Sequence, residues 1–93
     1  MTRAAIYAAI DAERIRQRDK WANPHPWGRG DASSHEVDET TKVAVLAEEC
    51  GEVARAVLDI RHDDLRRELI QVAAVAVAWL EAFEGEEPTL WQS

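Results

Sequence analysis

Apolar residues recur three and four positions apart along most of this chain, and this spacing strongly limits the folds open to it. No segment alternates apolar and polar residues as a half-buried strand would. Alanine, glutamate, arginine and leucine, which favour helices, are frequent. The predicted helices cover residues 3–20, 39–59 and 64–83. Their expected N-terminal caps are Thr2, Asp38, and Asp63 or Asp64. We therefore expect an all-α fold.

The third predicted helix contains a stretch, Val72 to Leu80, that has no polar residue. A helix that is apolar on every side must be covered on every side, which two other short helices cannot do. The short connection around Arg61 predicts that the second and third helices run antiparallel. The expected architecture is an antiparallel bundle of three main helices, with a core completed by homo-oligomerisation.

The 93 residues are expected to form a single domain. Between the first two helices, residues 21–37 contain prolines, glycines, Asn and Ser, which predict a long loop without regular structure. Such loops in small domains are usually functional or disordered, and the tryptophans Trp21 and Trp27 argue against full disorder. Gly85 is expected to end the third helix, ahead of a C-terminal tail of residues 86–93.

The charge balance excludes several kinds of partner. Eighteen acidic residues against eleven basic ones give a net charge of −7, which argues against a nucleic-acid polymer or an anionic membrane. No apolar run is long enough to span a bilayer. The lone cysteine, Cys50, cannot form an intrachain disulfide, which is typical of a cytoplasmic protein. Cys50 is expected to be a small core residue.

Acidic residues are concentrated on the second predicted helix. Glu48, Glu49 and Glu52 share about 100° of its circumference. Glu68 and Gln71 lie one turn apart on the third helix, at heights that match Glu52 and Glu49 within about 3 Å if the helices pair about Arg61. Converging oxygen ligands suit Mg²⁺, with Mn²⁺ as an alternative, and Mg²⁺ usually meets carboxylates together with substrate phosphates. The alternative is that this cluster is a solvated helix face.

These residues carry a family resemblance. The stretch Leu46 to Ala54, with Glu48, Glu49 and Glu52 in it, and the stretch Glu68 to Val72 resemble the MazG-like all-α nucleoside triphosphate pyrophosphohydrolases. The upstream run from Arg16 to Trp21 is also similar. The resemblance covers about residues 13–83. It implies a homodimer or homotetramer that hydrolyses a nucleoside triphosphate to the monophosphate and pyrophosphate, with Mg²⁺ as cofactor.

The resemblance also implies residue roles. The implied metal ligands are Glu49, Glu52, Glu68 and Gln71, and the implied catalytic residues are Glu48 and Glu49. The expected substrate contacts are Lys20, Trp21, His25, Lys42 and Arg55, where Trp21 would stack a nucleobase and His25 would contact phosphate or base. The alternative for Trp21 and His25 is that they anchor the loop.

Gln71 departs from the family pattern, which has Asp at this position. Its amide oxygen can still bind a hard cation, but without a negative charge. This change leaves two other hypotheses open. One is a catalytically weakened relative that binds a nucleotide or a protein partner. The other is a helical dimerisation module that is not an enzyme. The base and sugar of the nucleotide are not predicted.

Overall fold

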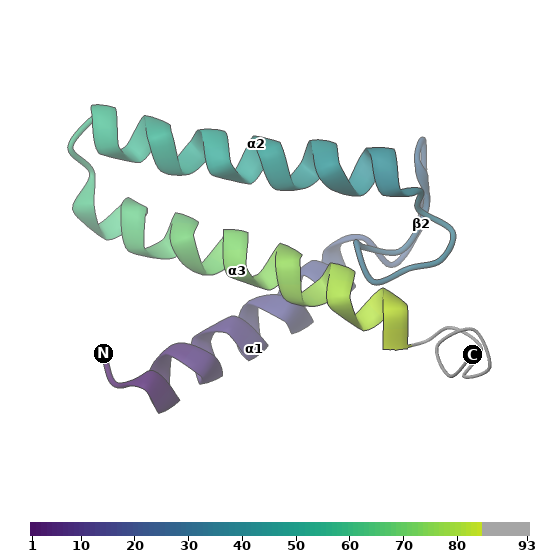
Figure 1. Ribbon diagram of the computed structural model, residues 1–93, viewed down its shortest axis with the longest axis horizontal. Coiled ribbons are helices and arrows are strands. Elements are labelled where there is room, and N and C mark those ends of the chain that lie inside the picture. Colours follow the sequence, from purple (N-terminus) through teal and green to yellow (C-terminus); the bar gives the residue numbers. More distant parts are fainter. Residues whose placement is uncertain (85–93) are drawn as a thin grey trace.

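Two antiparallel helices joined by a short turn form the frame of the structure, which is a computed structural model that describes residues 1–84. Helix α2 covers Glu39–Leu58 and helix α3 covers His62–Glu84, and they lie side by side (Figure 1). The expectations for Gly85 and the tail lie outside the described residues. The all-α class and the antiparallel pairing are confirmed.

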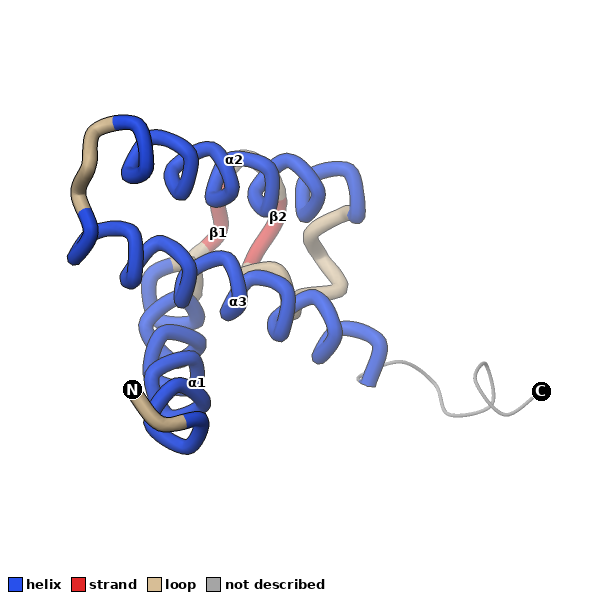
Figure 2. Tube along the Cα trace, turned by 60° about the vertical axis from the view of Figure 1, so that its left-hand side comes forward, coloured by secondary structure: helices blue, strands red, loops and turns tan. Residues whose placement is uncertain are grey.

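Helix α1 covers Arg3–Lys20 and crosses α3 at an angle (Figure 2). It packs against α3, whereas within residues 1–84 the backbones of α1 and α2 do not come close to each other. Thr2 caps α1 by accepting a hydrogen bond from the Ala5 N–H, and Asp38 caps α2 in the same way from Thr41. Both predicted caps are confirmed. The predicted start of the third helix is wrong. Helix α3 begins at His62, so Asp63 and Asp64 lie in its first turn and neither is its N-terminal cap.

The sequence predicted a loop without regular structure between α1 and α2, and this prediction is wrong in part. The segment contains a two-stranded antiparallel ladder, in which β1 (Pro24–His25) pairs with β2 (Gly28–Arg29). Gly28 adopts φ +129°, and a Cβ atom there would lie 2.1 Å from the Glu36 carbonyl oxygen. Only glycine fits both the backbone angle and this close approach, so Gly28 determines how the hairpin folds back.

Small side chains form the centre of the helix packing. The fully or almost fully buried apolar residues are Val37, Ala56, Ala74, Val75, Ala78 and Ala82. Alanine at these positions lets the helix backbones approach closely, but it buries little apolar area per residue. None of the helices described within residues 1–84 has the length and apolar character needed to cross a membrane.

The outward face of α2 corrects one prediction. Cys50, expected in the core, is exposed. It belongs to a stripe of exposed apolar residues, which we call the outer stripe of α2: Val43, Ala47, Cys50, Ala54 and Val57. The apolar residues follow the spacing expected for one helix face, but this face of α2 turns away from α3. Gly51 lies beside the stripe, and apart from its chain neighbours and the backbone of its own helix turn, no described atom lies within 4 Å of a Cβ placed there, so a close neighbour within this chain does not explain this glycine.

Candidate functional site

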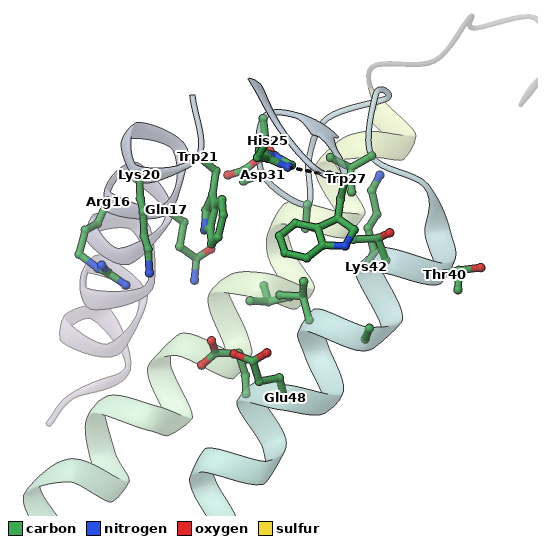
Figure 3. Close-up of a pocket in the computed structure, with 18 residues that line it drawn as sticks. Arg16, Gln17, Lys20, Trp21, His25, Trp27, Asp31, Thr40, Lys42 and Glu48 are labelled. Carbon is green, nitrogen blue, oxygen red and sulfur yellow. Dashed lines mark hydrogen bonds between the residues drawn. The ribbon is translucent and has the colours of Figure 1, made fainter. Parts of the chain in front are cut away.

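A cavity of about 390 Å³ lies between α1 and α2 (Figure 3). The C-terminal turns of α1, the hairpin segment and the N-terminal half of α2 surround it. Its volume falls in the range of small-molecule sites, roughly 300–1,000 Å³. Six of the predicted site residues line it: Lys20, Trp21, His25, Lys42, Glu48 and Glu49.

Aromatic rings form one wall of the cavity. Trp21 contacts His25 edge to face, with ring centroids 5.4 Å apart, and His25 lies 6.0 Å from the Trp27 ring. The Trp21 and Trp27 rings extend into the space above Glu48 (Figure 3). Both tryptophans remain exposed on at least a third of their surface. Exposed indole faces beside a cavity are suited to stacking against a flat ligand.

His25 has a defined place in the loop. Its Nδ1 accepts a hydrogen bond from the Trp27 N–H, and its Nε2 lies 2.8 Å from the Gly30 carbonyl oxygen. Because Nδ1 accepts, Nε2 carries the proton and donates. Both ring nitrogens are therefore used by the loop backbone, and this arrangement favours the anchoring interpretation of His25 over a direct contact to phosphate.

The acidic residues of α2 and α3 meet beside the cavity. One terminus of the Gln71 amide group lies between the two carboxylates, 3.0 Å from Glu49 Oε2 and 2.8 Å from Glu68 Oε2. Glu48 lines the cavity, whereas Glu52 is exposed and does not line it. In residues 1–84 no ion pair involves Glu48, Glu52 or Glu68. The pairing heights expected from the sequence thus bring Glu49, Glu68 and Gln71 together.

Glu49 has the most perturbed carboxylate of the cluster. Partial burial is the main cause that raises its pKa, and the negative charges of Glu68, Glu48 and Glu52 raise it further. Arg16, whose own pKa is raised chiefly by its hydrogen bonds to Glu13, interacts electrostatically with Glu49. A carboxylate in such surroundings gains from a bound cation or a proton.

The predicted cationic residues separate into two groups. Lys42 is 4% exposed in the first turn of α2, and Lys20 places its ammonium 5.2 Å from the centre of the Trp21 ring. Both line the cavity. Arg55 is exposed in the last turn of α2 and does not line it. Within one chain, Lys20 and Lys42 are therefore placed to contact a ligand in the cavity and Arg55 is not.

The sequence analysis missed a buried ion pair behind the cavity. Arg14 donates to Asp31 at 2.6 Å and also to Glu81, so that it joins α1, the loop and α3. Arg14 is 3% exposed, and Gln17, one turn later, is 8% exposed. A signal existed, because Arg14 and Gln17 continue the Ile6 and Ile10 spacing of three and four. A search for apolar residues alone overlooks this signal, because Arg14 and Gln17 are polar.

The side chains of the acidic cluster have the chemistry that a divalent cation needs, but they are not arranged around a common point. Glu48, Glu49, Glu52 and Glu68 supply the oxygen ligands that Mg²⁺ and Mn²⁺ prefer. Among the described residues, however, no three acidic, histidine or cysteine side chains converge as a ready-made metal site. Binding a cation at this cluster therefore requires side chains to turn toward it.

Comparisons with known proteins add no assignment. Neither a family model, nor a curated protein, nor a solved structure was found to match this chain.

Proposed function

We propose that the chain is a small Mg²⁺-dependent nucleoside triphosphate pyrophosphohydrolase, of the kind that the MazG-like resemblance implies. The observation that carries the proposal is the cavity, which has tryptophan rings on one side and Glu48 and Glu49 on another, next to Glu68. An aromatic wall suits a nucleobase. A group of carboxylates suits the cation that accompanies a triphosphate.

In the proposed reaction, water attacks the α-phosphorus of the triphosphate. A new P–O bond forms to the water oxygen, the bond between the α-phosphorus and the bridging oxygen breaks, and pyrophosphate leaves. Glu48 lines the cavity, and in this proposal it accepts the proton of the water. Glu49, Glu52 and Glu68 would hold the Mg²⁺ or Mn²⁺, which neutralises phosphate charge when bound.

The first test is pyrophosphate release from a panel of ribo- and deoxyribonucleoside triphosphates, with Mg²⁺, with Mn²⁺ and with chelator. We expect Glu49→Ala to lower release at least about a hundredfold. Glu36→Gln is the matched control, because Glu36 is an exposed loop carboxylate that does not line the cavity. Equal activity of Glu49→Ala and the parent would disprove the assignment of the site.

The second test concerns Trp21. Stacking of a base on an aromatic ring contributes about 1–3 kcal/mol, so Trp21→Ala should weaken nucleotide binding about tenfold or more. The nucleotide affinity of Trp21→Phe, which keeps a smaller ring, should lie between those of the parent and Trp21→Ala. Titration calorimetry with a nucleotide in chelator, which blocks turnover, gives these affinities. Tyr7→Ala, an exposed aromatic on α1 that does not line the cavity, serves as the control.

A second candidate is a relative that binds a nucleotide or a protein partner but has lost most of its activity. Gln71 favours it, because an amide contributes no charge where the resemblance implies Asp. Nucleotide binding that depends on Trp21, without pyrophosphate release from any of the panel, would support this candidate. If no nucleotide binds and Mn²⁺ leaves the melting temperature unchanged, the helical dimerisation module is favoured.

We also propose that the chain works as a homodimer or homotetramer. The outer stripe of α2 leaves Val43 and Val57 more than half exposed. On α3, Leu69 is 52% exposed and Leu80 64% exposed. Apolar area of this extent beside a core made largely of alanine is best stabilised by a second copy.

A further inference from the structure

We infer that the Gln71 amide bridges Glu49 and Glu68 in the metal-free protein and that a divalent cation must displace it, so that Gln71 competes with the cation rather than binding it. The inference deepens the proposed function, because it rests on the same carboxylates. It differs from the sequence-based expectation, in which the Gln71 amide oxygen is a ligand.

The orientation of the amide group follows from its neighbours. Glu49 Oε2 lies 3.0 Å and Glu68 Oε2 lies 2.8 Å from one amide terminus of Gln71. Ionised carboxylates only accept hydrogen bonds, so the terminus that faces both of them must be the NH₂ group. An amide oxygen there would face two negatively charged oxygens. Both protons of the NH₂ group are thus used, one for each carboxylate, and the amide oxygen points away from the pair.

The bridge stabilises two helices at a point where they would otherwise repel. Glu49 belongs to α2, whereas Glu68 and Gln71 belong to α3. Without a donor between them, the two carboxylates would face each other with like charge. The NH₂ group offsets part of that repulsion, but it brings no net positive charge.

The same geometry opposes a cation. Mg²⁺ binds oxygens at about 2.0–2.1 Å, along the lone pairs that the NH₂ group now occupies. An amide proton and a cation cannot use the same lone pair of one carboxylate oxygen. A cation that binds Glu49 and Glu68 through these two Oε2 atoms therefore requires the NH₂ group to rotate away, and the loss of two charge-assisted hydrogen bonds is subtracted from the binding free energy of the cation.

The experiment measures Mn²⁺ affinity, by the paramagnetic resonance signal of free Mn²⁺, and the melting temperature in chelator. The parent is compared with Gln71→Leu, which removes both hydrogen bonds at similar volume. Gln17→Leu is the matched control, because the Gln17 amide donates to Glu13 instead. For Gln71→Leu we expect Mn²⁺ to bind about tenfold more tightly and the metal-free protein to melt at a lower temperature. For Gln17→Leu we expect the parent's Mn²⁺ affinity.

A ligand role for Gln71 makes the opposite prediction: Gln71→Leu would then bind Mn²⁺ more weakly, and the inference would be wrong. It would also be wrong if Gln71→Leu melted at the same temperature as the parent, or if neither that variant nor Gln71→Asp bound Mn²⁺. These readouts are separate from the proposed function. Tighter Mn²⁺ binding by Gln71→Leu, with no pyrophosphate release by any variant, would support the bridge and reject the pyrophosphohydrolase.

Discussion

At the scale of single residues, the buried pair of Arg14 and Asp31 joins α1 to the loop beside the cavity. Their side chains are 4% and 5% exposed. Burial alone would raise the pKa of Asp31, but hydrogen bonds from Ser33 and from Arg14 outweigh it and lower the pKa. The pair ties the loop that carries the aromatic wall to α1, so the shape of the cavity depends on it.

Replacing Asp31 with Asn should therefore destabilise the protein. Because the change leaves Arg14 buried without its buried charged partner, we expect a loss of about 3 kcal/mol at neutral pH. The folded-state pKa of Asp31 is lowered, so its contribution is fully present above about pH 4 and is lost as the pH falls through the lower folded-state value. Urea unfolding at a series of pH values should show the parent and variant converging in acid. A constant difference down to the lowest pH would contradict this account.

At the scale of elements, the turn between α2 and α3 contains a strained residue. The Arg61 N–H donates to the Ala56 carbonyl and the Ile60 N–H donates to Val57, which together end α2 in a Schellman motif. This motif requires a left-handed residue, usually glycine, and here Ile60 adopts φ +54°. The helix pairing that brings Glu49 to Glu68 is thus built on a turn that its own sequence does not favour.

We expect Ile60→Gly to raise the free energy of unfolding by about 1 kcal/mol. Relief of the left-handed strain of a β-branched residue exceeds the added entropy of an unfolded glycine. Leu58→Gly is a matched control, since both side chains are 77% exposed but Leu58 is helical. That control should lose about 1 kcal/mol. Thermal unfolding measures both, and a lower melting temperature for Ile60→Gly would indicate that Ile60 is covered by another chain.

At the scale of the whole molecule, the outer stripe of α2 predicts self-association. We expect a dimer or tetramer by light scattering coupled to size-exclusion chromatography. Ala54→Glu, which places a charge within the stripe, should shift the protein toward the monomer. Ala8→Glu, at an exposed position of α1, should not. A parent that stays monomeric across a concentration series would show that a single chain tolerates this apolar surface.

Much of the fold was predictable because local patterns determine it. The spacing of apolar residues marks helices wherever they pack, and Thr2 and Asp38 cap α1 and α2 through bonds to their own next turn. The short turn at Arg61 made the pairing of Glu49 with Gln71 predictable from helical rise alone. The small β1–β2 ladder was missed because it depends on Gly28 and on a contact with Glu36, which lies beyond the hairpin.

By itself, the sequence determined that this protein has three helices, that the last two are antiparallel, and that acidic residues from both meet. Only the tertiary structure decided which apolar faces are covered, so Cys50 is exposed and Arg14 is buried. It also decided that one end of the Gln71 amide group lies between the two carboxylates, and the orientation that we infer for its NH₂ group follows from that position. The physical reason is that helix formation follows from near neighbours in the chain, whereas burial and hydrogen-bond orientation depend on residues brought close by folding.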